Sequence, residues 1–271
     1  QLEKMRIDKN KINKIVIKVG TNLLTTDDSQ FNAEKVELIC SQIIELQKNN
    51  KQIVLISSGA IALGKRMVNI TEKKMDIQLK QATAAIGQTL LISEWNKVFN
   101  KSKVITAQAL LSRNDFINST SSKNAKNALL KLLELNIITI INENDVVSTE
   151  EIENSIIGDN DNLSALVAKL IDADLLIILT DQDGLYDKNP SKSDDSKLIT
   201  EIRDINNEIL NAADSTTNKH GTGGMATKIE AANLAMEAGI HVVIANGNEK
   251  NIVHKIINNK IIGTHFLPKD N

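Results

Sequence analysis

The sequence has very few of the residues on which small secreted or metal-stabilised folds depend. It contains a single cysteine, Cys40, which excludes an internal disulfide framework and any zinc cage built from several cysteines. Aromatic residues make up only 2% of the chain. No apolar run approaches the roughly 18 residues of a membrane span, and residues 1–14 have no apolar core of signal-peptide length. We therefore expect a soluble, cytoplasmic protein with no membrane partner.

The chain also lacks a surplus of charge of one sign. Lys and Arg number 32 and Asp and Glu number 34, so the net charge is −2. Proteins that bind nucleic acids by neutralising phosphates usually carry a basic surplus. There is no aromatic-rich basic stretch either, and we expect no nucleic-acid partner.

Proline, which is common in linkers between domains, is rare as well, and this bears on domain organisation. The only prolines are Pro190 and Pro268, and neither lies in a linker-like change of composition. At about 150 residues per domain, 271 residues suggest one large α/β domain or two small ones. The charged segment 191–197 is typical of a surface loop. We predict one domain, with two lobes at most.

Short apolar runs alternate with segments of helical periodicity along the chain. Val36, Ile39 and Ile43, for example, recur at the spacing of one helix face. The predicted strands cover residues 12–19, 52–57, 104–108, 137–142, 175–180, 241–245 and 261–266. The predicted helices cover residues 33–48, 77–100, 125–135, 162–171 and 225–238. Strands separated by helices indicate right-handed crossovers and a mainly parallel sheet covered on both faces.

Glycine and small polar residues gather where the predicted strands end. Ligands of such sheets bind outside the carboxyl ends of the strands, where backbone amides can point outward. The segments that follow a strand or open a helix are residues 18–21, 57–60, 142–145, 158–162, 180–181 and 221–228. We predict that the ligand site is built from these segments.

Two of these segments have the composition of anion sites. A glycine-rich turn at a helix N-terminus offers unpaired N–H groups and the positive end of the helix dipole. Lys18 and Lys228 add full positive charges beside Gly20 and Gly224. Each segment alone could be a plain turn with a solvated lysine. Their joint occurrence at a strand end and a helix start favours phosphate binding.

A near match to a phosphate-binding loop occurs at residues 59–66 and is rejected. The Walker A pattern requires a hydroxyl residue directly after its lysine to hold Mg²⁺. Arg66 stands there after Lys65, and residues 60–63 are apolar and helix-forming. We predict that they form the first turns of a helix that begins after Ser58 and Gly59.

Other catalytic signatures are missing from the sequence. We find no protein-kinase H-R-D or D-F-G motif, no G-x-S-x-G elbow and no H-E-x-x-H pair. The four histidines show no metal-ligand spacing. Cys40 and Trp95 lie on the apolar faces of predicted helices, which indicates packing roles for both.

Taken together, the segments at the strand ends resemble the glutamate 5-kinases of the amino acid kinase superfamily, over about residues 15–266. The first and last of these segments are shared across the superfamily, whereas N-E-N-D and G-D-N-D-N-L-S-A are more specific to this branch. The matching segments are K-V-G-T at 18–21, S-S-G-A-I-A at 57–62, I-N-E-N-D at 141–145, G-D-N-D-N-L-S-A at 158–165, L-T-D-Q at 179–182 with G-L-Y at 184–186, and G-T-G-G-M-A-T-K at 221–228.

The resemblance implies a fold, an activity and a role for individual residues. The fold would be a three-layer α/β/α sandwich, and the reaction would convert ATP and L-glutamate to ADP and L-glutamyl 5-phosphate, the first step of proline biosynthesis. Lys18 and Lys228 would stabilise the transferring phosphoryl group, with Asp161 orienting both. The implied glutamate-binding residues are Ser58, Gly59, Asp145 and Asn160. The implied ATP-binding residues are Lys18, Gly20, Thr180, Asp181, Thr222, Gly223, Gly224, Met225, Ala226, Thr227 and Lys228.

The resemblance also implies partners and domain boundaries. Mg²⁺ would be carried by ATP without a protein metal site, L-proline would be a feedback inhibitor, and the chain would form a homodimer or homotetramer that hands its product to the glutamyl-phosphate reductase. The kinase domain would span residues 15–267, with the glutamate site in its N-terminal lobe and the ATP site in its C-terminal lobe. Residues 1–14 would be an extension, with Met5 as one candidate start. The PUA domain that follows in many bacterial relatives is not in this sequence, which fits a short form or a truncated one.

Two other interpretations compete with this one. Related kinases of the superfamily act on N-acetylglutamate, aspartate, UMP or carbamate, and the N-E-N-D and G-D-N-D-N segments argue against them. A non-catalytic amino-acid sensor would be expected to lose Lys18, Lys228 or Asp161, and all three are present.

Overall fold

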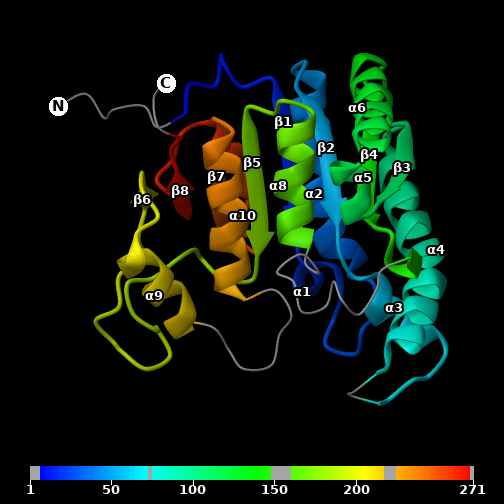
Figure 1. The fold of residues 1–271 in the computed structure, drawn as a ribbon, viewed down its shortest axis with the longest axis horizontal. Helices are drawn as coiled ribbons and strands as arrows, with labels where there is room; N and C mark the ends of the chain where they lie inside the picture. Colours follow the sequence, from blue (N-terminus) through cyan, green and yellow to red (C-terminus); the bar gives the residue numbers. More distant parts are fainter. Residues whose placement is uncertain (1–6, 73–74, 148–159, 217–223, 269–271) are drawn as a thin grey trace.

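An eight-stranded sheet organises the described part of the chain, residues 7–72, 75–147, 160–216 and 224–268, in the computed structural model (Figure 1). Its strands are ordered β3-β4-β2-β1-β5-β7-β8-β6, and only the β7–β8 pair is antiparallel. The predicted, mainly parallel sheet is therefore confirmed. The strands are β1 Lys14–Val19, β2 Gln52–Ser57, β3 Thr106–Leu111, β4 Ile138–Glu143, β5 Leu175–Thr180, β6 Glu201–Ile202, β7 His241–Asn246 and β8 Thr264–Phe266.

The most apolar strands lie at the centre of the sheet. Val16 of β1 is level with Val54 of β2 on one side and with Leu176 of β5 on the other. All six residues of β5 are buried. A parallel strand covered by helices on both faces excludes water from both, so it is apolar throughout. This is why the sequence showed these strands as continuous runs of Ile, Leu and Val.

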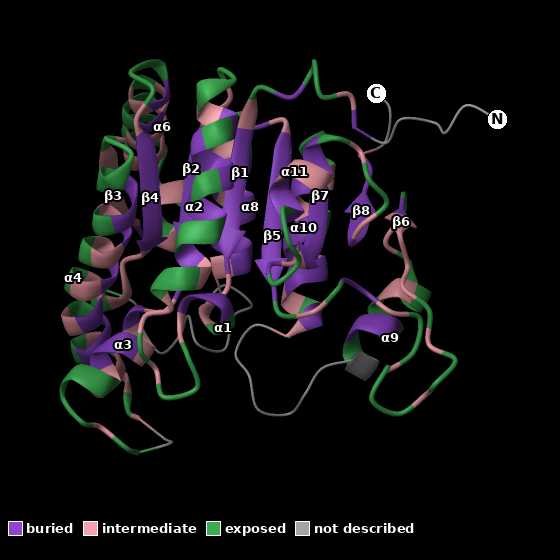
Figure 2. Ribbon diagram, turned by 180° about the vertical axis from the view of Figure 1, so that it is seen from behind, coloured by how far each residue is buried: buried purple, intermediate pink, exposed green. Residues whose placement is uncertain are grey.

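Helices cover both faces of the sheet and enclose a separate hydrophobic core on each (Figures 1 and 2). One face is covered by α2 (Ala33–Lys48), α3 (Ala60–Met67), α4 (Ile77–Lys101) and α11 (Ile252–Ile257). The other is covered by α6 (Ser119–Glu134), α8 (Asn160–Leu170), α9 (Asn207–Thr216) and α10 (Met225–Glu237). The short helices are α1 (Thr21–Leu24), α5 (Arg113–Ile117) and the 3₁₀ turn η1 (Asp145–Val147). The three-layer α/β/α sandwich is thus confirmed.

The sequence predicted most helices and strands correctly. Its errors lie where partial burial or polar residues obscured the periodic pattern of apolar residues. Strand β3 begins and ends later than residues 104–108, because it is an edge strand and most of it is only half-buried. Helix α6 begins six residues before the predicted start, with Asn118 as its N-cap. Its first turns are polar and carry no apolar periodicity. The predicted packing roles of Cys40 and Trp95 are confirmed, since both are buried.

The N-terminal boundary drawn from the sequence does not coincide with the edge of the core. Ile7 and Ile12 lie within the predicted extension, yet their side chains are buried in the core formed with α2 and α4. Lys14 already belongs to β1. None of the described helices is long and apolar enough to cross a membrane.

Helices α3 and α4 pack with their backbones in contact, which explains the near match to a Walker A pattern. A Cβ atom added to Gly64 would lie 1.8 Å from the carbonyl oxygen of Thr83, and one added to Gly87 would lie 1.8 Å from that of Ala60. The glycine of the apparent motif therefore serves a helix crossing. The helix predicted after Ser58 and Gly59 is confirmed as α3.

Candidate active site

Four neighbouring parallel strands end at one edge of the sheet, and the predicted ligand segments meet there. In sheet order, β4 leads to Asn142, β2 to Ser58, β1 to Lys18 and Gly20, and β5 to Thr180. Together with the first turns of α3, α8 and α10, this edge encloses a pocket of about 490 Å³. The position agrees with the rule that ligands of parallel sheets bind beyond the carboxyl ends of the strands.

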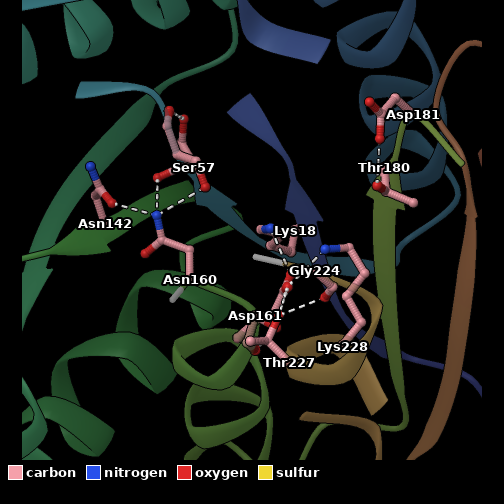
Figure 3. A network of polar contacts seen from close by, with 12 residues as sticks. Lys18, Ser57, Asn142, Asn160, Asp161, Thr180, Asp181, Gly224, Thr227 and Lys228 are labelled. Carbon is pink, nitrogen blue, oxygen red and sulfur yellow. Dashed lines mark hydrogen bonds and ion pairs between the residues drawn. The ribbon is translucent and has the colours of Figure 1, made fainter. Parts of the chain in front are cut away.

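Lys18 and Lys228, which line the pocket, form a buried cluster of charged side chains with Asp161 (Figure 3). Asp161 is fully buried, and its two carboxylate oxygens lie 2.6 Å from Nζ of Lys18 and 3.0 Å from Nζ of Lys228. The side chains of both lysines are about 5% exposed. Two ammonium groups and one carboxylate give the cluster a net charge of +1. A buried positive charge that opens onto a polar pocket is suited to an anion.

The two lysines determine the ionisation state of Asp161. Burial alone would raise the pKa of this carboxyl, but the charges of Lys18 and Lys228, together with the hydrogen bonds that they donate, hold it well below its ordinary value. The Thr227 hydroxyl donates a further hydrogen bond of 3.1 Å to the carboxylate. Asp161 is therefore ionised at neutral pH and keeps both ammonium groups in place.

Two helix N-termini add partial positive charge beside the cluster. Asp161 lies in the first turn of α8, and Lys228 follows the first turn of α10, whose N-cap is Gly224. The first N–H groups of a helix lack partners within it, and the helix dipole is positive at that end. The lysines and the helix starts therefore favour the same kind of ligand, one with several anionic oxygens.

On the β2–β4 side of the cluster, carboxamides and hydroxyls line the pocket. Nδ2 of Asn160 donates to Oγ of Ser58 at 3.0 Å, to Oδ1 of Asn142 at 3.0 Å and to the carbonyl oxygen of Ser57 at 3.3 Å. Ser57 is held in turn by the indole N–H of Trp95 at 2.8 Å. Oδ1 of Asn160 is buried and has no hydrogen-bond partner among the described residues. This buried oxygen therefore still needs a hydrogen-bond donor.

A carboxyl group with an unusual pKa lies on the same side. Asp145 opens the turn η1 directly after β4 and lines the pocket. Burial raises its pKa to about 6. Ionising a buried carboxyl group costs free energy, and a bound cation offsets that cost. The position of Asp145 therefore suits an ammonium group.

On the β5 side, Thr180 and Asp181 line the pocket at the end of the strand. The Thr180 hydroxyl donates to Oδ1 of Asp181 at 3.1 Å, and Nδ2 of Asn22 donates to Oδ2 at 2.8 Å. Figure 3 shows this pair on the opposite side of the lysine cluster from Asn160.

The structure brings together most of the residues singled out in the sequence. Ser58, Gly59, Asp145, Asn160, Lys18, Gly20, Thr180, Asp181 and Lys228 all line the one pocket. Gly224, Met225, Ala226 and Thr227 form the start of α10 beside it. Thr222 and Gly223 lie outside the described residues. Gly59, the N-cap of α3, has a φ of +101°, a left-handed conformation that favours glycine.

The sequence did not indicate several other residues of the pocket. Lys65 and Lys80 line it from α3 and α4, and Asn22 reaches it from α1. Lys65 was visible only as part of the rejected Walker-like segment. No local pattern distinguished Lys80 from other helix-surface lysines, because its place depends on how α3 packs against α4.

Within the described ranges, no group of three or more His, Cys, Asp or Glu side chains is arranged to hold a metal ion. Magnesium at phosphate-handling sites is often held by one or two carboxylates and by the phosphates of the substrate itself. The carboxylate Asp181 at the pocket fits that pattern better than a cage made by the protein alone.

Residues 13–246 match the amino acid kinase family. The chain is 44% identical over 255 residues to glutamate 5-kinase from Dehalococcoides mccartyi, covering 94% of this chain and 68% of the relative. It is 45% identical over 258 residues to glutamate 5-kinase from Caldanaerobacter subterraneus, covering 95% and 68%. The glutamate 5-kinase of Methanosarcina acetivorans is 44% identical over 263 residues.

Solved structures with low sequence identity share the fold. N-acetylglutamate synthase from Neisseria gonorrhoeae aligns with a TM-score of 0.69 at 18% identity, over 97% of this chain and 62% of that one. UMP kinase from Ureaplasma parvum aligns with a TM-score of 0.63 at 17% identity, over 95% and 99%.

Proposed function

This chain belongs to the amino acid kinase family and, within it, to the glutamate 5-kinases, and from that premise we propose how its pocket carries out the reaction. The activity is ATP-dependent phosphorylation of the γ-carboxylate of L-glutamate to L-glutamyl 5-phosphate, the first step of proline biosynthesis. The proposal assigns glutamate to the β2–β4 side of the lysine cluster and ATP to the β5 side.

Glutamate would bind where the site offers both donors and acceptors. The carboxylate of Asp145 and Oδ1 of Asn160 would receive the α-ammonium group, which carries the only N–H donors of the substrate. Ser58 and the backbone amides at the start of α3 would hold a carboxylate. These assignments are supported by the place of all three side chains in one pocket and by the raised pKa of Asp145.

ATP would bind with its phosphates between β5 and α10. The N-terminus of α10, with Lys228 in reach, would receive the phosphates, and Thr180 and Asp181 would contact the nucleotide from the end of β5. Mg²⁺ would enter as part of the Mg²⁺–ATP substrate, with Asp181 as the carboxylate of this chain nearest to it. We place the reaction in the cytoplasm, where ATP is supplied.

The chemistry needs positioning and positive charge, and it does not need a general base. The γ-carboxylate is already ionised at neutral pH, so no proton has to be removed before it attacks the γ-phosphorus. A bond forms between that carboxylate oxygen and phosphorus as the bond from phosphorus to the β,γ-bridging oxygen breaks, and ADP leaves with the electron pair. The obstacle is repulsion between two anions. Lys18 and Lys228 would reduce it, with Asp161 holding both ammonium groups.

The observation that carries this assignment is the buried Lys18–Asp161–Lys228 cluster between two different halves of one pocket. The test is ATP-dependent acyl-phosphate formation trapped with hydroxylamine, across L-glutamate, N-acetyl-L-glutamate, L-aspartate, carbamate and UMP, with ADP release followed for the last. The expected result is rapid hydroxamate formation with L-glutamate and at least tenfold less product from the others. Preference for another acceptor would contradict the assignment.

We also propose the partners that the resemblance implies. L-Proline would inhibit by occupying the glutamate side, because it shares the α-carboxylate and a cationic nitrogen but has no γ-carboxylate to phosphorylate. The chain would act as a homodimer or homotetramer, which sedimentation analysis measures directly. Its labile acyl phosphate would pass to the glutamyl-phosphate reductase.

A further inference from the structure

A row of side-chain amides connects the surface of the molecule with the glutamate side of the pocket. Gln108 on β3 accepts from Nε2 of Gln88 at 3.3 Å, and Oε1 of Gln88 accepts from Nδ2 of Asn142 at 2.8 Å. Oδ1 of Asn142 accepts in turn from Nδ2 of Asn160 at 3.0 Å. Gln88 itself lies on α4 and lines a separate groove of about 440 Å³ outside the pocket.

Backbone groups determine which way the inner amides face. The N–H of Glu143 donates at 2.8 Å to the same atom of Asn142 that faces Asn160, so this atom must be the oxygen. Asn160 faces the carbonyl oxygen of Ser57 at 3.3 Å, so its atom there must be the nitrogen. It follows that Asn142 presents its nitrogen to Gln88 and that Asn160 keeps its oxygen for another partner.

The remaining oxygen of Asn160 needs a hydrogen-bond donor. It is buried, it has no hydrogen-bond partner among the described residues, and its residue lines the pocket. A buried acceptor of this kind requires a donor. At neutral pH both carboxylates of glutamate are acceptors only, and the α-ammonium group alone can donate.

We propose that Gln88 is a positioning residue that holds Asn142 and Asn160 in the orientation that receives the α-ammonium group of the substrate. The inference rests on the proposed assignment of this side of the pocket to glutamate. Asn142 is only 3% exposed, so without Gln88 its Nδ2 would have to find another acceptor. Gln88 touches neither substrate nor reacting atoms, and it acts through the two asparagines.

The fold gives Gln88 a fixed position from which to do this. Gly87, directly before it, is the residue of α4 whose Cα lies against the backbone of α3. Trp95, seven residues later and on the same face of α4, donates to Ser57 at 2.8 Å. Helix α4 therefore supports the glutamate side at two points, through Gln88 to Asn142 and through Trp95 to Ser57.

The test compares Gln88→Met, which keeps the shape but removes the acceptor, with Gln88→Glu, which keeps an acceptor for Asn142. The control is Thr89→Ala, the next residue of the same helix, whose hydroxyl is exposed and bonds only its own helix at Ile86. For each variant we would measure kcat, the KM values for glutamate and ATP, and the inhibition constant of glutarate, which has both carboxylates but no α-ammonium group. Gln88→Ala serves as a second deletion if the Met variant folds poorly.

The expected result is a glutamate KM raised about tenfold in Gln88→Met, as for a buried donor left without its acceptor. We expect the ATP KM, kcat and the glutarate inhibition constant to stay within about threefold, and Gln88→Glu and Thr89→Ala to stay near wild type. An unchanged glutamate KM in both deletions would overturn the proposal. So would equal weakening of glutamate and glutarate, or equal damage from Gln88→Glu. A wild-type enzyme that fails to phosphorylate glutamate would instead refute the proposed function.

Discussion

Two buried lysines share one buried carboxylate at the centre of the site, and this arrangement determines what each residue can contribute. Lys18 comes from a strand and Lys228 from a helix, while Asp161 joins them from a second helix. Two ammonium groups around one carboxylate give these three side chains a net charge of +1. A positive charge at this position favours a phosphoryl group whose negative charge changes during transfer.

Replacement of Lys228 tests the role of this charge in the transition state. We expect Lys228→Ala to lower kcat by about 10²–10³ while the KM for glutamate changes little, because a preorganised charged donor matters most as the phosphoryl group transfers. Steady-state kinetics with both substrates varied give the two parameters. Lys169→Ala, an exposed lysine on α8, is the control. A kcat within threefold of wild type would refute the assignment of Lys228.

Asp161→Asn separates orientation of the lysines from helix capping. The substitution keeps the size of the side chain but removes the charge that pairs with both ammonium groups, so we expect most turnover to be lost. A cap alone would cost about 1 kcal/mol of unfolding free energy and leave the folded enzyme active. The neighbouring Asn162→Ala is the control, since the Asn162 amide donates to Glu230 of α10 at 3.3 Å. Thermal melting measured beside kcat distinguishes the two roles.

The raised pKa of Asp145 gives glutamate binding a pH dependence. Its pKa of about 6 means that Asp145 loses its charge as the pH falls below 6, so the KM for glutamate should rise there. In Asp145→Asn the KM should be higher at pH 7.5 and should no longer rise with acidification through this range. A wild-type KM that does not change between pH 7.5 and 5.5 would contradict the prediction.

The same pKa predicts an effect of opposite sign on stability. The folded pKa of Asp145 lies above the unfolded value of about 3.9, so the folded state binds more protons between these values and stability falls as the pH rises through them. We therefore expect Asp145→Asn to be more stable than wild type at pH 7.5 without ligand, by up to about 3 kcal/mol. Asp161, with its lowered pKa, has the reverse dependence, and the stability it contributes is lost only in strong acid.

At the scale of elements, the packing of α3 against α4 positions several residues around the pocket. Gly59, the N-cap of α3, lines the pocket, and so does Lys80 of α4, while Gln88 and Trp95 of α4 bond Asn142 and Ser57 beside it. The two helices approach so closely at Gly64 and Gly87 that neither position has space for a Cβ atom. A displacement at this crossing would therefore move residues that line the pocket.

Gly64→Ala tests this coupling. Alanine normally stabilises a helix by about 0.5–1 kcal/mol relative to glycine, so any loss of stability measures the clash with the Thr83 carbonyl. We expect the melting temperature to fall by several degrees and the KM for glutamate to rise, with the KM for ATP less affected, because α3 borders the glutamate side. Increased stability with unchanged kinetics would contradict a tight crossing.

At the scale of the whole molecule, the order of the strands separates the two substrates. β4 and β2 lie on one side of β1, and β5 lies on the other, so the lysine cluster from β1, α8 and α10 comes between the proposed glutamate and ATP sides. Substrates that bind on different sides of one cluster meet only at the phosphoryl group that is transferred.

This separation predicts the pattern of inhibition by L-proline. An inhibitor seated on the glutamate side should compete with glutamate and not with ATP. Asp145→Ala should weaken glutamate and proline together, because the lost carboxylate would receive the cationic nitrogen of both. Initial rates at several concentrations of each substrate test this. Inhibition that glutamate cannot relieve, or a variant that loses glutamate affinity yet keeps full proline sensitivity, would show that the two do not share a site.

Much of the molecule followed from local pattern. Continuous runs of Ile, Leu and Val identified β1, β2, β4 and β5, because strands covered on both faces are apolar along their whole length. Glycine and small polar residues marked the ends of the strands. Parallel α/β sheets in general bind their ligands beyond the carboxyl ends of their strands, so these segments could be assigned to the ligand site. Lys18 and Lys228 were visible for the same reason, whereas the role of Asp161 was implied by the resemblance to the glutamate 5-kinases.

Contacts between distant segments decided the rest, and these have no local signal. The sequence excluded a phosphate loop around Gly64, because Arg66 stands where a hydroxyl residue is required, but only the structure showed that Gly64 lies against Thr83 and Gly87 where α3 crosses α4. Gln88 is one polar residue among several on α4, and its hydrogen bond to Asn142 spans 54 positions of the sequence. The sequence by itself determined the layers, the ligand edge and the charged groups, because each depends on neighbours along the chain. Only the tertiary structure decided how the amides of Asn142 and Asn160 are oriented, since it brings Asn160 of α8 against the backbone of Ser57 in β2 and the side chain of Asn142 in β4.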